Sequence, residues 1–105
     1  MYIFNVTFNI DDAIIDEGLS FFKQIYIPEA TTNGLLFNPR ICYVYPNHDD
    51  DEGKSYSIQF YVESRMILEE WRLTIGEPLH QEIIDRFGSG VIGFVTLMEV
   101  LDLDS

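Results

Sequence analysis

The sequence predicts an α+β fold in which four antiparallel strands form one sheet and two helices cover one of its faces. Two observations lead to this prediction. Apolar and polar residues alternate over residues 2–10 and 55–63, and apolar residues recur at helical spacing in two other segments. The resulting order is strand, helix, strand, strand, helix, strand. Because 105 residues is the size of one compact domain, we expect a single domain over residues 1–105.

The first half of the chain supplies a strand, a helix and a second strand. Residues 2–10 alternate between large apolar side chains and Asn or Thr, which is typical of a half-buried strand. Asp11 follows and can cap a helix. Apolar residues at helical spacing predict a helix that ends near Pro28, since the residue before a proline disfavours helical geometry. Residues 35–45 predict the second strand, with an edge or a bulge near Pro39.

The second half of the chain again supplies a strand, a helix and a strand. Residues 55–63 alternate again, and Ser64 is a good cap for the next helix. We expect Gly76 and Pro78 to interrupt that helix, with a second piece running to residue 87. Residues 91–101 predict the last strand. The complete pattern is that of a ferredoxin-like βαββαβ fold.

The last strand predicts that the open face of the sheet is covered. It is apolar on both of its faces, whereas a sheet wetted on one side normally alternates. We place Val95, Leu97 and Leu101 on the open face, beside Ile3 and Tyr61. A second copy of the same sheet is the simplest cover, so we expect a homodimer through this face. A wet face with scattered apolar residues is the alternative.

Charge and composition exclude several partners. Eighteen acidic and six basic residues give a net charge of −12, which argues against nucleic acid, because phosphate binding depends on Lys and Arg. No segment has the roughly 20 apolar residues of a membrane helix, and the N-terminus lacks a basic signal region. We therefore expect no membrane partner and a cytoplasmic protein, in which Cys42 stays reduced and packs as a small apolar side chain.

Three short motifs suggest chemistry, and structural explanations fit each of them better. Residues 88–93, GSGVIG, have dinucleotide-loop spacing, but a helix precedes them and a strand follows, so we expect a helix cap and a turn. Residues 47–53, NHDDDEG, lack the Gly and the bidentate Glu of a calcium loop and favour a solvated loop. His48 and His80 have no further ligands beside them. We predict no metal, no cofactor and no catalytic residue.

Four segments resemble a known family: FNVTFNID, YIPEATTNGLLFN, SYSIQFYVES and RFGSGVIGFVTLMEV. They are similar to short bacterial proteins that form a domain of unknown function. The resemblance covers nearly the whole chain and implies a ferredoxin-like fold similar to the dimeric α/β barrels, with no activity attached. The family's pattern has His, Trp and Arg where this chain has Tyr26, Gly18 and Val95. No site is therefore carried over from relatives.

Two functions remain open. The first is a non-enzymatic homodimeric binding or interaction module, which we favour because no catalytic constellation is visible. The alternative is a cofactor-independent enzyme or small-ligand binder of the dimeric α/β-barrel type. Its cavity would lie between the helices and the sheet, or between the two sheets of the dimer, and would be lined by aromatic and amide side chains. Its candidate ligand-binding residues are Asn5, Asn9, Gln59, Tyr61 and Tyr43, with Phe8 beside them. A filled core would favour the first function, and a pocket with convergent polar groups would favour the second.

Overall fold

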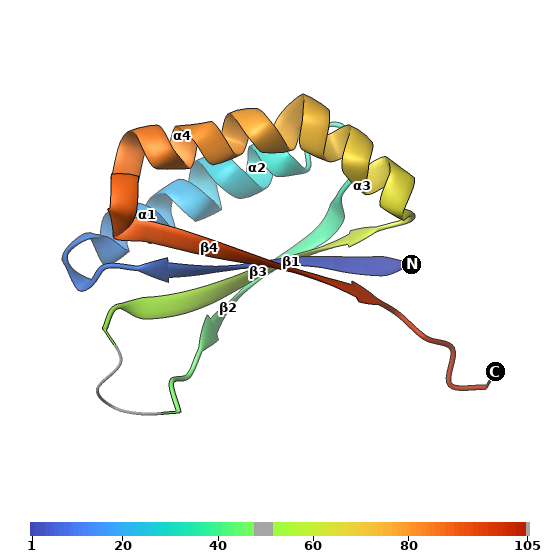
Figure 1. Ribbon diagram of the computed structural model, residues 1–105, viewed down its shortest axis with the longest axis horizontal. Coiled ribbons are helices and arrows are strands. Elements are labelled where there is room, and N and C mark those ends of the chain that lie inside the picture. Colours follow the sequence, from blue (N-terminus) through green and yellow to red (C-terminus); the bar gives the residue numbers. More distant parts are fainter. Residues whose placement is uncertain (48–51, 105) are drawn as a thin grey trace.

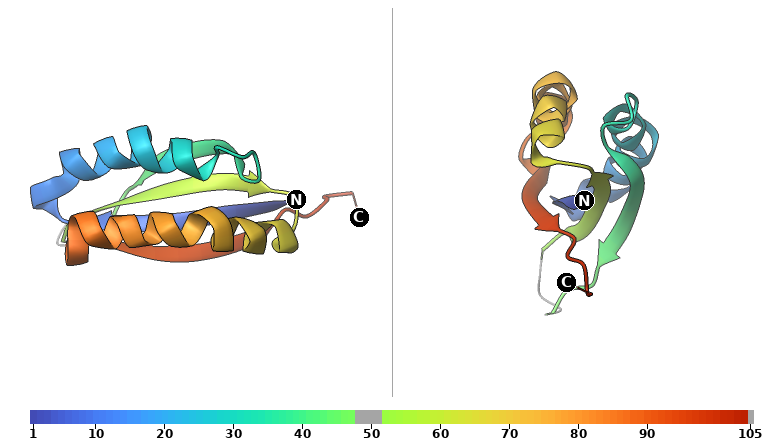
Figure 2. Two further views of the ribbon diagram at one scale, coloured as in Figure 1. Left: turned by 90° about the horizontal axis from the view of Figure 1, so that it is seen from above. Right: turned by 90° about the vertical axis from the view of Figure 1, so that its right-hand side faces the viewer.

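The computed structural model describes residues 1–47 and 52–104, and its elements follow the predicted order (Figure 1). The strands are β1 (Tyr2–Ile10), β2 (Phe37–Val44), β3 (Lys54–Val62) and β4 (Val91–Glu99). All pairings are antiparallel, and the strand order is β2-β3-β1-β4. The helices lie on one face of this sheet (Figure 2). The α+β, ferredoxin-like prediction is confirmed.

Two continuous helical stretches cover the sheet, and each is built from several segments. The first contains η1 (Asp12–Ile14), α1 (Ile15–Phe21), η2 (Phe22–Tyr26) and α2 (Ile27–Ala30). The second contains α3 (Arg65–Trp71), η3 (Arg72–Gly76) and α4 (Glu77–Phe87), and a short turn, η4 (Gly88–Gly90), leads into β4. Both predicted caps are present, because Asp11 accepts a hydrogen bond from the Ala13 amide and Ser64 accepts one from the Ile67 amide.

The prediction that the first helix ends near Pro28 was wrong, whereas the second helical piece expected to run to residue 87 is present as α4. The chain continues as helix past Pro28 and Pro78, and the segments just before them, η2 and η3, are π-helical. There the amides of Ile27 and Glu77 donate to carbonyls five residues back, on Phe22 and Arg72. A proline has no amide hydrogen and its ring crowds the preceding turn, so a wider turn lets the helix continue.

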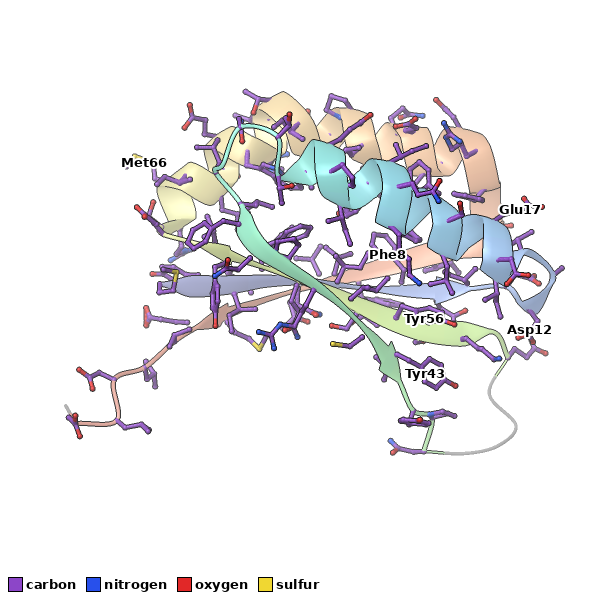
Figure 3. The ribbon with its side chains drawn as sticks, turned by 180° about the vertical axis from the view of Figure 1, so that it is seen from behind. Phe8, Asp12, Glu17, Tyr43, Tyr56 and Met66 are labelled. Carbon is purple, nitrogen blue, oxygen red and sulfur yellow. The ribbon has the colours of Figure 1, made fainter. Side chains whose placement is uncertain are left out.

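The core lies between the helices and the sheet face that the alternation predicted. Phe4, Val6, Phe8 and Ile10 of β1 are buried there, as are Ile58, Phe60 and Val62 of β3. The helices contribute a cluster of rings that includes Phe21, Phe22 and Tyr26. Figure 3 shows Phe8 pointing from the sheet toward the helices. Burial of these large apolar groups is the main stabilisation available to a chain of this size.

Trp71 ties the two helical stretches to each other and to the sheet. Its indole Nε1 donates a 2.8 Å hydrogen bond to the carbonyl of Ala30 on the other helical stretch. Its ring meets Phe4 edge to face, with the centroids 5.4 Å apart. Gly76 lies against the same ring, so closely that a Cβ there would be 2.6 Å from Trp71 Cζ3. The indole is 3% exposed and fills the space where the three parts meet.

The predicted faces of the last strand were exchanged. In the β1–β4 register, Val95 pairs with Val6 and Leu97 with Phe4, so both lie on the helix side. Ile92, Phe94 and Met98 instead share the open face with Ile3 and Thr7. The error arose because a strand that is apolar on both faces carries no alternation to fix its register. Both faces of β4 remain exposed, with Phe94 at 64% and Val95 at 65%.

The turns and the edge strand β2 agree with the sequence except at Cys42. Gly88 has a positive φ and ends α4, as a helix cap does. The β2 register shifts between Phe37 and Arg40, which confirms the bulge expected near Pro39. Cys42, expected to pack as an apolar side chain, is exposed, because its side of β2 is the open face. Residues 48–51, with His48 and most of the predicted calcium-like loop, lie outside the described part of the chain.

We predict that Gly76→Ala destabilises the protein. Helix propensity alone favours Ala over Gly by about 1 kcal/mol. The contact with Trp71 opposes this, because the ring is buried and cannot move without breaking its hydrogen bond. We expect a net loss of about 1–3 kcal/mol in the free energy of unfolding, measured by urea denaturation.

Gly18→Ala is the matched control for this prediction. Its Cβ would meet only the Ile10 side chain, at 3.1 Å from both Cδ1 and Cγ2, which is a longer distance than the 2.6 Å at Gly76. We expect a smaller loss there. A Gly76→Ala protein as stable as the unmodified chain would contradict the role given to Trp71.

Candidate functional site

The predicted amide residues lie on the open face of the sheet, where Asn5 and Asn9 bond mainly to hydroxyl side chains of the same face. Asn5 pairs with Gln59 across β1 and β3, and it is 7% exposed. Its amide nitrogen donates to Thr7 Oγ1 at 3.1 Å, and its carbonyl oxygen accepts from the Ser57 hydroxyl. Asn9 donates to Ser55 Oγ at 3.2 Å. These bonds hold the sheet together and leave few polar groups of Asn5 and Asn9 directed at a ligand.

Of the predicted residues, the structure brings only Gln59 and Tyr61 into a common hollow on this face. The hollow has a volume of about 40 Å³, and Arg40 and Asn38 also line it. It has room for roughly one water molecule. Tyr43 is separate from this group, because β2 turns it to the helix side, where its ring lies 5.4 Å from that of Tyr56 (Figure 3).

A much larger cavity lies on the other face, between the second helical stretch and the sheet. Its volume is about 930 Å³, within the range of small-molecule sites. We call it the helix–sheet cavity. Its floor is formed by β1 and β4, through Phe4, Val6, Phe8, Gly93, Val95 and Leu97. Of the candidates named from the sequence, Phe8 alone lines it.

The wall of the cavity comes from the helices. Leu68, Trp71 and Ile83 line it from α3 and α4, and Tyr26 lines it from the end of η2. Gly93 keeps the floor low, because a Cβ there would be 2.9 Å from the Phe8 ring. The cavity is therefore an apolar and aromatic chamber, and the exposure of Val95 and Leu97 shows that it opens along β4.

Charged side chains on the second helical stretch surround the mouth of the cavity. Arg72 makes two hydrogen bonds to the Glu69 carboxylate, at 2.6 and 3.0 Å, and one to Glu77 at 2.6 Å. Residues five apart do not share a face of an α-helix. The π-helical turn η3 places Arg72 and Glu77 one above the other and so allows the second pair. Arg65, His80 and Gln81 also line the mouth.

Arg72 also determines the protonation state of Glu69 at this mouth. Its hydrogen bonds lower the pKa of Glu69 below the ordinary value, and its own pKa is raised by Glu69 first and Glu77 second. All three side chains are about half exposed, so solvent screens the pairs. The carboxylate of Glu69 therefore stays ionised at neutral pH.

Tyr26 is the polar side chain at the depth of the cavity. It is 4% exposed, and its ring contacts those of Phe8, Phe22 and Phe60. Its hydroxyl makes no hydrogen bond to residues 1–47 and 52–104, and its oxygen is not completely enclosed, because no fully buried side-chain N or O atom of these residues lacks a partner. Burial raises the pKa of this phenol well above its ordinary value.

Sequence reasoning allowed a cavity between the helices and the sheet, but it missed the π-helical turns that bring Tyr26 and Arg72 to that cavity, because it treated each proline as a helix end. A signal was present, however. Buried or half-buried residues recur at a strict spacing of four through both prolines, at Ile14, Gly18, Phe22, Tyr26 and Ala30, and at Ile67, Trp71, Ile75, Leu79, Ile83 and Phe87. Four residues overshoot an α-helical turn by about 40°, so such a stripe would drift around the helix. One wider turn corrects the drift, and the strict spacing is thus evidence for a π-helical turn.

The chain belongs to the family described as a domain of unknown function, DUF4286, whose model matches residues 1–101. This confirms the resemblance found in the sequence. Tyr26 and Val95, two of the positions singled out by the resemblance, both line the helix–sheet cavity. Gly18 instead packs against Ile10 in the core. No curated protein matches the chain.

Solved structures share the fold at low sequence identity. An ethyl tert-butyl ether d (ethd) family protein from Bacillus halodurans matches with a TM-score of 0.72 and 9% identity, covering 96% of this chain and all of that one. An antibiotic biosynthesis monooxygenase matches with a TM-score of 0.66 and 17% identity over 97% of this chain and all of that one. A Mycobacterium tuberculosis protein matches with a TM-score of 0.63 and 17% identity over both entire chains. These likenesses establish the fold alone.

Within the described residues, no helix is both long and apolar enough to span a membrane, and no three His, Cys, Asp or Glu side chains gather as metal ligands do.

The raised pKa of Tyr26 predicts a specific loss of stability in alkali. Folding favours the protonated phenol, so the stability is unchanged below the ordinary phenol pKa of about 10 and is lost as the pH rises through the raised value. We expect the free energy of unfolding to fall more steeply above about pH 10 in the unmodified chain than in Tyr26→Phe. Urea denaturation of both proteins across this range tests it, and identical pH dependence would contradict the burial of an ionisable group at this position.

Proposed function

We propose that the chain is a homodimeric module that binds a small, largely apolar molecule in the helix–sheet cavity. The observation that carries the proposal is the cavity itself, about 930 Å³ in volume and floored by apolar and aromatic side chains. The cavity opens along β4, so its apolar lining is in contact with solvent. An apolar ligand that fills it removes this surface from water, which favours binding. The proposal combines the homodimeric binding module favoured from the sequence with the small-ligand site of the alternative, the dimeric α/β-barrel type.

The mouth of the cavity supports binding rather than acid–base catalysis. A general acid or base needs a pKa near the working pH. The pKa of Glu69 is instead lowered, away from neutral pH, because Arg72 stabilises its carboxylate. Arg72 in turn is shared between Glu69 and Glu77, and each of its three nitrogens already donates to one of these carboxylates. These side chains form a polar entrance to the cavity.

The open face of the sheet supports association with a second copy. Ile92, Phe94 and Met98 expose an apolar strip along β4, and the amides of β1 and β3 lie beside it. In the registered strand positions of this face, the only charged side chain is that of Arg40. Two copies that each carry a charge of −12 repel wherever acidic groups meet. A face free of acidic residues is therefore the surface on which such a protein can pair with itself.

The neighbouring residues Val95 and Phe94 provide a matched test of ligand binding. Both are about two-thirds exposed on the same strand, and they lie on opposite faces. We expect Val95→Trp to fill part of the cavity and weaken binding of the neutral fluorophore dimethylaminonaphthalene by about tenfold or more, measured by fluorescence titration. Phe94→Trp on the other face should leave that affinity unchanged. Equal binding by both variants would place the probe outside the cavity.

The same two positions also test the dimer, and here Phe94 is the test position and Val95 is the control. Phe94→Asp puts a charge on the proposed interface, and Val95→Asp puts it on the helix side. At tens of micromolar, we expect light scattering to give twice the chain mass of 12.2 kDa for the unmodified protein and for Val95→Asp. Phe94→Asp should give a mass near 12.2 kDa. A monomeric unmodified protein would refute the dimer and leave the ligand cavity as a separate question.

A further inference from the structure

We propose that the Tyr26 hydroxyl is the specificity determinant of the helix–sheet cavity, and that its ligand is an uncharged aromatic molecule carrying a hydrogen-bond acceptor such as a carbonyl oxygen. This inference rests on the proposed function and names the ligand class for the same site. It starts from an unpartnered polar group in an otherwise apolar chamber.

The Tyr26 hydroxyl has no hydrogen-bond partner in the described part of the chain, although the residue is only 4% exposed. Every completely enclosed side-chain N or O atom there has a partner, so the Tyr26 oxygen keeps a small contact with open space. Tyr26 lines the helix–sheet cavity, and its ring is enclosed by Phe8, Phe22 and Phe60. The cavity is therefore the space from which a partner can reach the hydroxyl.

Two other polar groups that line the cavity are already committed, and Arg65, His80 and Gln81 lie at its mouth. The Trp71 indole N–H donates to the Ala30 carbonyl and cannot serve a ligand. Arg72 holds Glu69 and Glu77 at the mouth. The floor side chains of β1 and β4 are apolar. Tyr26 thus supplies the one orienting contact in the depth of the chamber, in the manner of small-molecule sites that combine apolar walls with few polar groups.

The protonation state of Tyr26 fixes the character of its partner. Burial keeps the phenol neutral, so the group offers an O–H donor. A phenol is a better donor than acceptor, which favours a ligand that presents an acceptor. A charged ligand is disfavoured, because the floor has no counter-ion and burying an unpaired charge is costly. The surrounding rings favour a planar aromatic body through offset and edge contacts.

The π-helical turn η2 is what puts Tyr26 in this position. Tyr26 is the last residue of η2, immediately before Ile27 and Pro28. The wider turn keeps Phe22 and Tyr26 on one face, both fully directed to the core side. In a regular α-helix the stripe would have drifted by that point. Turns of this kind occur frequently at functional sites.

The test uses two probes that differ in one acceptor. One is dimethylaminonaphthalene, and the other is the same fluorophore with a propionyl group. Tyr26→Phe removes the hydroxyl and keeps the ring contacts. We expect it to weaken binding of the ketone by about three- to tenfold and to leave binding of the probe without the carbonyl group unchanged. Tyr56→Phe, on the same sheet face outside the cavity, is the control and should alter neither affinity.

The outcomes separate the ligand class from the cavity. If Tyr26→Phe binds both probes as the unmodified protein does, the role of the hydroxyl is overturned while the cavity stands. If it weakens both probes equally, its role is structural and the inference is again overturned. If neither probe binds the unmodified protein, or if Val95→Trp binds both normally, the proposed cavity function fails and the inference fails with it. The unfolding midpoint of Tyr26→Phe at neutral pH, equal to or above that of the unmodified chain, confirms that the variant folds.

Discussion

Trp71 contacts three parts of the molecule at once, and the arrangement of the helices follows from those contacts. Its N–H bonds the carbonyl of Ala30 on the opposite helical stretch, its ring edge meets Phe4 on the sheet, and its face lies against Gly76. The hydrogen bond fixes how far apart the two stretches lie. The ring fixes the height of the second stretch above β1. The helices consequently cover β1 and β3 closely, and the helix side of β4 stays open as the floor of a cavity.

The prolines have a comparable influence at a smaller scale. Pro28 and Pro78 each follow a π-helical turn, and each turn places a residue at the cavity: Tyr26 at the end of η2, and Arg72 at the start of η3. The wider turn in η3 also brings Glu77 to Arg72, so the charged entrance and the apolar interior arise from the same backbone feature. The π-helical turns therefore supply residues to the cavity, and the regular α-helical segments around them fix the positions of these residues.

The fold could be predicted because local patterns and tertiary contacts agree there. Alternation in β1 and β3 placed Phe4, Phe8 and Ile58 in the core, and Asp11 and Ser64 capped the helices as expected. The site could not, for two physical reasons. β4 is apolar on both faces, so Val95 and Leu97 carried no signal of which face they occupied. The amides Asn5 and Asn9 look like ligand-binding groups in the sequence, but their partners lie across the sheet, in residues distant along the chain.

Methyl chemical shifts measured by NMR during titration with the ketone probe test the central claim most directly. The helix–sheet cavity and the open face share β1 and β4, and their methyl groups divide cleanly between the two sides. If the cavity binds the probe, the methyls of Leu68, Val95 and Leu97 shift in a saturable manner, and those of Ile3 and Ile92 do not. Shifts confined to Ile3 and Ile92, or spread equally over both faces, would contradict the assignment of the site to the cavity between the helices and the sheet.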